Sequence, residues 1–209
     1  MNVVVASIVA LAVGGLIGWL ARDEHRRPGT DQAGRPAVTE VDGVNLASVT
    51  DPMTGLFNRQ GYRLLAARLL REATRERRTA VLMLLDIDGL RAINDRLGHA
   101  VGDDAICSVA GLLRATFRDT DLVARIDGDE FCVMGMLPGA PGDGSAQLAR
   151  LDEAVKSYNA RDGAAFRLGL SGGLATWDPR QPVSLDTLEQ QADHRLYADK
   201  AIRGFHSSP

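Results

Sequence analysis

Apolar residues recur along the chain with two periods, one typical of helices and the other of strands. From 61 to 76 they are spaced three and four positions apart among arginines and glutamates, which predicts an amphipathic helix. From 80 to 87 an unbroken apolar run ends in Asp86-Ile87-Asp88 and is typical of a buried strand. The folded domain is therefore expected to begin with a helix followed by a buried strand.

A β-hairpin is predicted further along the chain. Two apolar-alternating runs, 121–126 and 129–136, flank the dipeptide Asp127-Gly128, which is a strong hairpin signal. The other expected elements are helices at about 89–97, 103–117, 145–159 and 184–201 and a strand at 166–176. The order of helices and strands predicts an α/β (α+β) domain, in which helices pack on a sheet that contains one antiparallel hairpin.

Two of these helices are expected to begin beside acidic residues. Asp88 precedes the helix at 89–97, and Asp103 stands at the start of the helix at 103–117. Asp is a favoured N-cap residue, because its carboxylate accepts from the free N–H groups of the first turn. We therefore expect both residues to cap helices.

The amino terminus has the composition of a membrane span. Residues 3 to 21 are apolar apart from Ser7, a length close to the ~20 residues that a helix needs to cross a bilayer. We expect residues 1–21 to form one transmembrane anchor. A signal peptide is the alternative, but no basic residue precedes the apolar run and no small-x-small cleavage pattern follows it. Because Arg22, Arg26 and Arg27 follow the run, the positive-inside rule places the rest of the chain in the cytoplasm, at the inner membrane.

Composition defines the remainder of the chain. Residues 22–48 are charged and then rich in Pro, Gly and Thr, which predicts a juxtamembrane linker before a folded domain at 49–209. A chain with 45% hydrophobic and 24% charged residues has enough apolar material for one core. The net charge of -3, with scattered basic residues, argues against nucleic-acid binding. Cys107 and Cys132 lack metal-ligand spacing, so neither a zinc site nor a disulfide framework is expected.

Acidic residues end the predicted strand and follow the predicted hairpin turn. Asp86 and Asp88 stand at the first position, and Asp129 and Glu130 at the second. Carboxylates are ligands that Mg²⁺ prefers, usually together with phosphate oxygens. If the two segments converge, they could hold a divalent cation against a phosphate, and the turn at 87–91 adds helix N-terminal N–H groups that suit a triphosphate.

Five ordered blocks of residues carry a resemblance to a known family. From about Thr50 to Gly204, the chain resembles the GGDEF family of diguanylate cyclases, whose motifs occur here in the family's order and at compatible spacing. The blocks are Asp51 to Arg59; Asp86 to Asp95 with Gly98-His99 and Gly102-Asp103; the signature Asp127 to Phe131; Ser171-Gly172-Gly173; and Ala192-Asp193 with Leu196-Tyr197 and Lys200.

The resemblance implies a fold and a reaction. The fold is a palm-like sheet of about five strands, related to that of other nucleotidyl cyclases, with an antiparallel hairpin that carries the active site. Two copies, forming a homodimer, each bind one GTP and condense the pair into cyclic di-GMP, releasing two pyrophosphates. The implied cofactor is Mg²⁺ or Mn²⁺. By the match, the metal ligands are Asp86, the carbonyl of Ile87 and Asp129, and Glu130 is a further catalytic residue beside them.

The resemblance also implies binding residues. The amide of Asn94 and the carboxylate of Asp103 complement the guanine edge, and Arg91 replaces the family's usual Lys as a donor to the terminal phosphate. Gly128 and Lys200 complete the implied substrate-binding set. Arg118 and Asp121 fit the family's Arg-x-x-Asp site for inhibition by cyclic di-GMP. Taken alone, Asn94 and Asp103 are also consistent with ordinary polar positions on a helix surface. Lys200 is likewise consistent with a residue that complements a helix dipole, and the segment from Arg118 to Asp121 with a solvated turn.

The chain departs from the family pattern at a few positions. Asp127 stands where the family has Gly; a carboxylate ~5 Å from a phosphate charge costs about 3 kcal/mol at an effective dielectric of ~20, so weaker GTP binding is expected. Leu90 replaces the usual Phe, and Arg203-Gly204 inverts the expected Gly followed by a basic residue. Two alternatives therefore stand beside the enzyme. One is a catalytically silent module that binds cyclic di-GMP through Arg118 and Asp121, and the other is a purely structural, membrane-tethered interaction domain.

Overall fold

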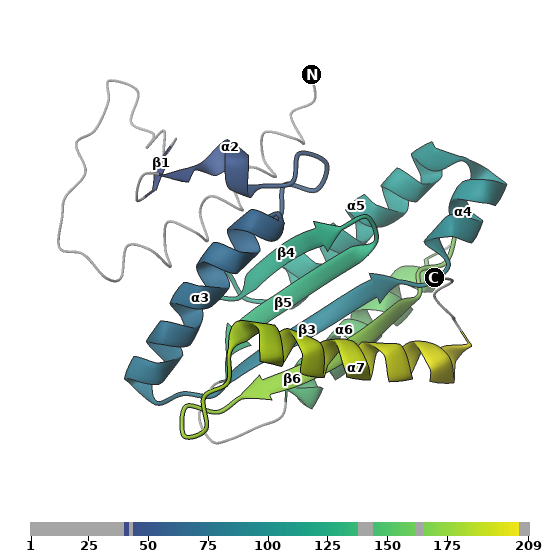
Figure 1. Cartoon of the computed structure of the whole chain (residues 1–209). Coiled ribbons are helices and arrows are strands. Elements are labelled where there is room, and N and C mark those ends of the chain that lie inside the picture. Colours follow the sequence, from purple (N-terminus) through teal and green to yellow (C-terminus); the bar gives the residue numbers. More distant parts are fainter. Residues whose placement is uncertain (1–39, 42–43, 138–143, 162–164, 205–209) are drawn as a thin grey trace.

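The computed structural model describes residues 40–41, 44–137, 144–161 and 165–204 (Figure 1). From residue 59 onward, the observed order of helices and strands is the predicted one. The elements are β1 (Glu40–Val41), β2 (Val44–Asn45), α2 (Leu46–Val49), α3 (Arg59–Glu76), β3 (Ala80–Ile87), α4 (Leu90–Leu97), α5 (His99–Thr116), β4 (Leu122–Asp127), β5 (Glu130–Met136), α6 (Ser145–Asn159), β6 (Leu170–Trp177) and α7 (Leu185–Arg203).

The main sheet has the strand order β4-β5-β3-β6, and every neighbouring pair is antiparallel. The described residues thus contribute four strands to this sheet, where about five were expected. Strand β6 begins at Leu170 instead of 166, because the amide side chain of Asn159 on α6 pairs with both backbone groups of Leu168 at 2.8 Å. That pairing removes Leu168 from the ladder.

Helices cover both faces of this sheet (Figure 1). Helices α3 and α7 pack on the front face, around a cluster that includes Tyr62, Leu82 and Leu188. Helices α5 and α6 pack on the opposite face, around Phe131 and Leu151. Strand β3 lies between them with side chains buried on both faces, which explains why its sequence is an unbroken apolar run. The carboxyl end of β3 is therefore held rigidly.

The predicted caps of α4 and α5 are wrong. Gly89, with φ 69°, is the N-cap of α4, and Asp88 turns its side chain elsewhere. Helix α5 begins at His99 because Gly98, with φ 89°, ends α4 and starts α5 in a backbone conformation that favours glycine. Asp103 consequently lies in the second turn of α5, where it is exposed.

The hairpin turn is shifted by one residue from the predicted position. Gly128 and Asp129 form the turn, and Asp127 pairs with Glu130 across the two strands. The ladder is irregular between Arg125 and Asp127, which accounts for the shift. As a result Asp129 lies at the tip of the hairpin.

The predicted transmembrane segment, residues 1–21, lies outside the described residues, as does most of the predicted linker, 22–48. Near the end of that linker β1 pairs with β2 and is followed by α2. None of the helices in the described ranges combines the length and the apolarity that a bilayer crossing demands.

Candidate functional site

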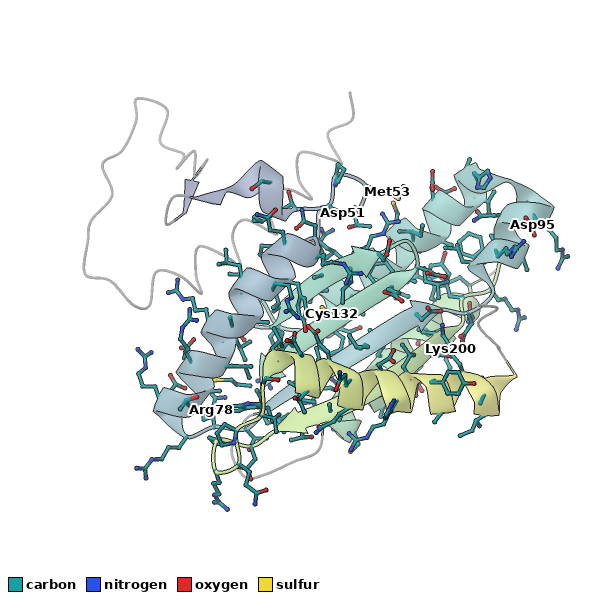
Figure 2. The ribbon with its side chains drawn as sticks, viewed as in Figure 1. Asp51, Met53, Arg78, Asp95, Cys132 and Lys200 are labelled. Carbon is teal, nitrogen blue, oxygen red and sulfur yellow. The ribbon has the colours of Figure 1, made fainter. Side chains whose placement is uncertain are left out.

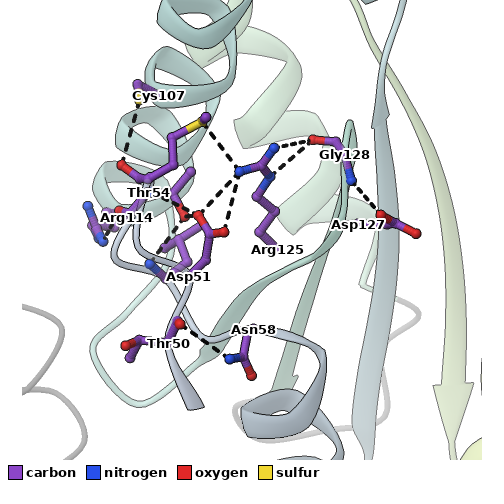
Figure 3. Close-up of polar contacts among 11 residues, drawn as sticks. Thr50, Asp51, Thr54, Asn58, Cys107, Arg114, Arg125, Asp127 and Gly128 are labelled. Carbon is purple, nitrogen blue, oxygen red and sulfur yellow. Dashed lines mark hydrogen bonds and ion pairs between the residues drawn. The ribbon is translucent and has the colours of Figure 1, made fainter. Parts of the chain in front are cut away.

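A charged bridge fixes the signature hairpin to the start of the domain (Figure 3). The Arg125 guanidinium donates through Nε and Nη2 to the carbonyl of Gly128, at 3.0 and 2.8 Å. Its Nη1 donates to Asp51 at 3.3 Å, and Asp51 also accepts from both the backbone N–H and the hydroxyl of Thr54. We call Asp51, Arg125 and Gly128 the Arg125 bridge. It explains the first of the five motif blocks, because Asp51 positions the turn that carries Asp129.

The carboxyl end of β3 meets the hairpin turn. Asp86 is the register partner of Glu130, and the N–H of Ile87 donates to the carbonyl of Asp129 at 3.2 Å. The structure thus brings acidic residues from two segments to one place, and we call Asp86, Asp129 and Glu130 the acidic centre. Asp86 is almost fully buried, Asp129 is half-buried and Glu130 is exposed.

These carboxylates influence one another electrostatically. Burial, together with the nearby charges of Asp129 and Glu130, raises the pKa of Asp86 to about 6, and Lys200 acts in the opposite direction. Burial also raises the pKa of Glu130, and the charges of Asp127 and Asp129 add to that shift. Negative charge is therefore concentrated at the strand end, which is the condition that attracts a cation.

Lys200 supplies a positive charge at this point. Its Nζ lies 2.7 Å from Oδ2 of Asp86, and the two side chains are only 14% and 10% exposed. Figure 2 shows Lys200 on the side of α7 that faces the end of β3. A residue about a hundred positions away in the sequence is thus a direct neighbour of the acidic group.

The donor set fits a magnesium ion that also binds substrate. In the described ranges no group of three or more His, Cys, Asp or Glu side chains is arranged around one point. Asp86, Asp129 and the carbonyl of Ile87 instead offer two carboxylates and one backbone oxygen. Mg²⁺ is commonly held by one or two carboxylates together with phosphate oxygens, unlike metals that need a complete protein cage.

A second polar group lies between α4 and α5. The Oδ1 atom of Asn94 is buried and has no hydrogen-bond partner. It lies against Gly102, where any side chain would overlap it. Asp103, the next residue, is exposed. A buried acceptor without a donor is costly in a folded protein, so this position is suited to a ligand with N–H groups.

Two implied phosphate contacts are arranged differently from each other. Lys200 faces the acidic centre, whereas Arg91 is 90% exposed and lies 4.0 Å from Asp95 on its own helix.

Asp127, the departure in the signature, is 76% exposed. Its carboxylate accepts from the N–H of Gly128 at 2.9 Å and lies 3.6 Å from Arg59. The extra negative charge is therefore directed to solvent and to a guanidinium.

The Arg-x-x-Asp segment, Arg118 to Asp121, forms a turn beside α6. Asp121 accepts from the backbone N–H of Arg118 at 3.0 Å. Burial raises the pKa of Asp121, while the charges of Arg118 and Arg150 act in the opposite direction. Arg150, from α6, lines the same small hollow and was not singled out in the sequence. Its place on an ordinary charged helix face gave no signal.

Sequence reasoning also missed a polar network behind the acidic centre. Asp88 accepts from the hydroxyl of Ser171 at 2.6 Å, which ties the exit of β3 to β6. Asp199 accepts from the N–H of Gly172 and from Nε of Arg203, each at 2.9 Å. Asp199 and Arg203 are an i,i+4 pair on one helix, but no sequence pattern predicts the contacts with β6.

A cleft of about 550 Å³ lies between α3 and α7 and borders the acidic centre at Glu130. Its walls carry Arg59 and Arg63 from α3 and Glu189 and Asp193 from α7. Asn94 and Asp103 do not line this cleft, so it is distinct from the polar position between α4 and α5. Glu130 is the residue through which the cleft and the acidic centre meet.

Comparison with known sequences identifies one family. The sequence model described as "Diguanylate cyclase, GGDEF domain" matches residues 48–204. The diguanylate cyclase TpbB of Pseudomonas aeruginosa is 35% identical over 159 residues, covering 74% of this chain and 36% of TpbB. The cyclic di-GMP phosphodiesterase NbdA of the same organism is 29% identical over 204 residues, covering 95% of this chain and 25% of NbdA. The chain thus spans about a third or less of these relatives.

Solved structures show the same fold. The GGDEF domain of DgcB from Caulobacter crescentus, determined in complex with c-di-GMP, is similar with a TM-score of 0.65 and 27% identity. The similarity covers 76% of this chain and 92% of that domain. An antiparallel sheet flanked by helices is therefore the arrangement of a known class of domain.

Proposed function

Because the chain belongs to the GGDEF family, whose description is diguanylate cyclase, we propose that it condenses two GTP molecules into cyclic di-GMP with release of two pyrophosphates. The observation that carries the proposal is the meeting of Asp86 and Asp129, through the backbone contact between Ile87 and Asp129. Two carboxylates beside a backbone carbonyl suit a magnesium–nucleotide complex. The TpbB relative carries the name of this activity.

The residues of the acidic centre have separate roles in this proposal. Asp86, Asp129 and the Ile87 carbonyl would hold Mg²⁺ or Mn²⁺, which supplies Lewis-acid stabilisation of charge on the phosphate oxygens. Glu130 keeps a further negative charge beside them. The Arg125 bridge holds Gly128, and with it the hairpin turn, at a fixed position. Preorganisation of this kind avoids the cost of ordering the turn when substrate binds.

Guanine is expected between α4 and α5. The unpaired Oδ1 of Asn94 would accept from an N–H of the base, and Asp103 would accept from the neighbouring donor. Lys200 would donate to a phosphate, and Arg91, which is exposed beside Asp95, would turn toward the terminal phosphate. These groups recognise one nucleotide, so the reaction requires a second copy of the chain that presents its own GTP.

Product inhibition is proposed at the Arg118–Asp121 turn. Arg118 can offer a guanidinium to a phosphate or a base, and Arg150 adds a second one from α6. The DgcB domain was solved in complex with c-di-GMP, which shows that a related domain binds this product. For this chain, the same turn would couple product concentration to activity.

The alternative is a silent module that binds cyclic di-GMP without making it. Asp127 in the signature favours this alternative, and one relative, NbdA, is named as a phosphodiesterase and not as a cyclase. Two observations favour the enzyme. Asp127 is 76% exposed and faces Arg59, so water and an opposite charge weaken its repulsion of substrate. The implied metal ligands Asp86 and Asp129 are also both present and adjacent.

Incubation of the purified full-length chain with GTP and Mg²⁺ tests the proposal, with cyclic di-GMP quantified by chromatography. We expect product from the natural sequence and loss of at least about 100-fold in rate for Asp129→Asn. Tight binding of added cyclic di-GMP with no synthesis would reject the enzyme in favour of the receptor. Absence of both synthesis and binding would favour a structural domain.

We also propose that residues 1–21 anchor the chain in the inner membrane with the domain in the cytoplasm. The apolar run and the arginines after it support this proposal. Fractionation of cells that produce the chain with and without residues 1–21 tests it. The full chain should sediment with membranes and the truncated chain should remain in the supernatant; membrane recovery of both would contradict the anchor.

A further inference from the structure

The ion pair between Lys200 and Asp86 occupies the place where a metal is proposed to bind. Lys200 Nζ lies 2.7 Å from Asp86 Oδ2, and both side chains are largely shielded from water. A carboxylate oxygen that contacts an ammonium at this distance has less charge to offer to another cation. In this arrangement, Lys200 and a divalent ion compete for the same carboxylate.

Three carboxylates, those of Asp86, Asp129 and Glu130, lie close together at the end of β3. The charges of Asp129 and Glu130 raise the pKa of Asp86, the charge of Asp129 also raises the pKa of Glu130, and Lys200 contacts Asp86 directly. A buried carboxylate without a counter-ion carries a large desolvation cost. In the protein without metal, Lys200 therefore reduces the repulsion among these carboxylates. A bound metal ion would reduce the same repulsion.

The turn of α7 that carries Lys200 is fastened from the adjacent position. Asp199 accepts from the N–H of Gly172 on β6 at 2.9 Å, and its second donor, Arg203, also lies 3.7 Å from Asp152 on α6. Strand β6 pairs directly with β3, with Ser171 opposite Asp86. Asp199 thus links the backbone beside Asp86 to the helical turn of Lys200, so the reach of the lysine is set by this contact.

We propose that Lys200 is a resident counter-ion of Asp86 that is exchanged for the metal when the metal–nucleotide complex binds, and that Asp199 is the residue that positions it for both states. On exchange, the ammonium leaves Asp86 and donates to a substrate phosphate within reach of the same helical turn. This inference rests on the proposed function, because it assumes that GTP binds at the acidic centre.

The exchange has a consequence for the order of binding. Metal alone must displace Lys200 without giving the ammonium a new partner, so binding of metal alone is disfavoured. Metal with GTP supplies phosphate oxygens as that partner, so the two ligands bind cooperatively. Removal of the ammonium should then affect the two ligands in opposite directions, which loss of a merely structural contact would not do.

Titration of the purified full-length chain with Mn²⁺, followed by electron paramagnetic resonance, tests the exchange without any turnover. At about pH 8, where carboxyl groups are ionised, Lys200→Met should bind Mn²⁺ alone at least about tenfold more tightly than the natural sequence. The same variant should bind a non-hydrolysable GTP analogue at least about tenfold more weakly in the presence of Mn²⁺. Lys156→Met, on the exposed face of α6, is the matched control and should change neither value.

Substitution of Asp199 tests its positioning role. Asp199→Ala should reproduce part of the change in Mn²⁺ affinity and part of the change in GTP-analogue affinity. Asp199→Asn should keep both affinities at their natural values, because its amide oxygen can still accept from the N–H of Gly172. The proposal is overturned if Lys200→Met binds Mn²⁺ alone no more tightly, if both ligands weaken together, or if Asp199→Asn behaves like Asp199→Ala. These are binding measurements, so they separate the inference from the proposed function. If the chain makes no cyclic di-GMP but Lys200→Met binds Mn²⁺ more tightly and the GTP analogue more weakly, the proposed function fails and this inference stands.

Discussion

At the scale of single residues, the environment of Asp127 decides how its charge acts. A carboxylate in the signature would repel a triphosphate if it were buried, but this one is 76% exposed and lies 3.6 Å from Arg59. Exposed charges are screened by water and salt, so their interactions are usually worth less than about 1 kcal/mol. The penalty inferred from sequence is therefore an upper bound that the local geometry reduces.

The Asp127 interpretation predicts a modest effect of reversion. Asp127→Gly should improve the affinity for the GTP–Mg²⁺ complex by less than about tenfold, because solvent already weakens the repulsion. In an Arg59→Gln background the gain should be larger, since the neutralising guanidinium is absent. Calorimetric titration of the four proteins of this cycle measures both effects. An improvement of 100-fold in the natural background would show that Asp127 blocks the site.

Gly102 offers a selective way to disturb the proposed guanine position. A Cβ at Gly102 would overlap Asn94 Oδ1, so Gly102→Ala should displace that amide and weaken GTP binding at least about tenfold. Gly111→Ala is the matched control on the same helix, because its Cβ would meet no atom within 4 Å. The control should gain up to about 1 kcal/mol in free energy of unfolding and keep its GTP affinity. Equal GTP affinity in both variants would remove Asn94 from the site.

The pKa of Asp86 gives the metal site a pH dependence. Burial, with the charges of Asp129 and Glu130, raises this pKa from 3.8 to about 6, so Asp86 binds a proton more readily in the folded state than in the unfolded chain. The free energy of unfolding therefore falls as the pH rises from 3.8 toward 6, because Asp86 loses its proton at a cost in the folded state. At lower pH the carboxyl group is protonated and that free energy is regained. Metal needs the ionised form, so Mn²⁺ affinity should be flat above about pH 6 and fall up to about tenfold per unit below it. Affinity unchanged down to pH 4 would contradict this assignment.

At the scale of elements, the Arg125 bridge explains why a motif far from the signature belongs to the site. Asp51 precedes α3, yet it fixes the turn between β4 and β5 through Arg125 (Figure 3). The sequence predicted β3 with its observed bounds, because a central strand buried on both faces has an unmistakable apolar run. It missed the start of α5, since that start depends on the positive φ of Gly98 and not on an N-cap side chain.

Breaking the Arg125 bridge should cost stability as well as activity. Arg125→Met leaves Asp51, which is 18% exposed, without its guanidinium, so the free energy of unfolding should fall by about 2 kcal/mol or more. Arg63→Met removes a surface arginine that is 48% exposed and should cost less than about 1 kcal/mol. Urea denaturation of both variants measures the difference. Equal losses would show that the bridge is an ordinary surface ion pair.

At the scale of the whole molecule, the two-sided packing of the sheet determines which residues can meet. Helices α4 and α5 hold the proposed guanine position, while α7 carries Lys200 across the opposite face to the end of β3 (Figure 1). The order of elements followed from the hydrophobic pattern, but the strand order β4-β5-β3-β6 did not. Pairing between distant segments depends on tertiary contacts, and for that reason the links of Asp88 with Ser171 and of Asp199 with Gly172 had no signal in the sequence.

The central claim is that the strand end and the hairpin turn supply one metal site beside one nucleotide. The most direct test is Mn²⁺ affinity in the presence of a non-hydrolysable GTP analogue for Asp86→Asn, Asp129→Asn and the double variant. If both carboxylates bind the same ion, each single substitution should weaken binding at least about tenfold, and the double variant should be little worse than the weaker single variant. Full affinity in either single variant, or losses in the double variant that multiply as for independent sites, would contradict the account.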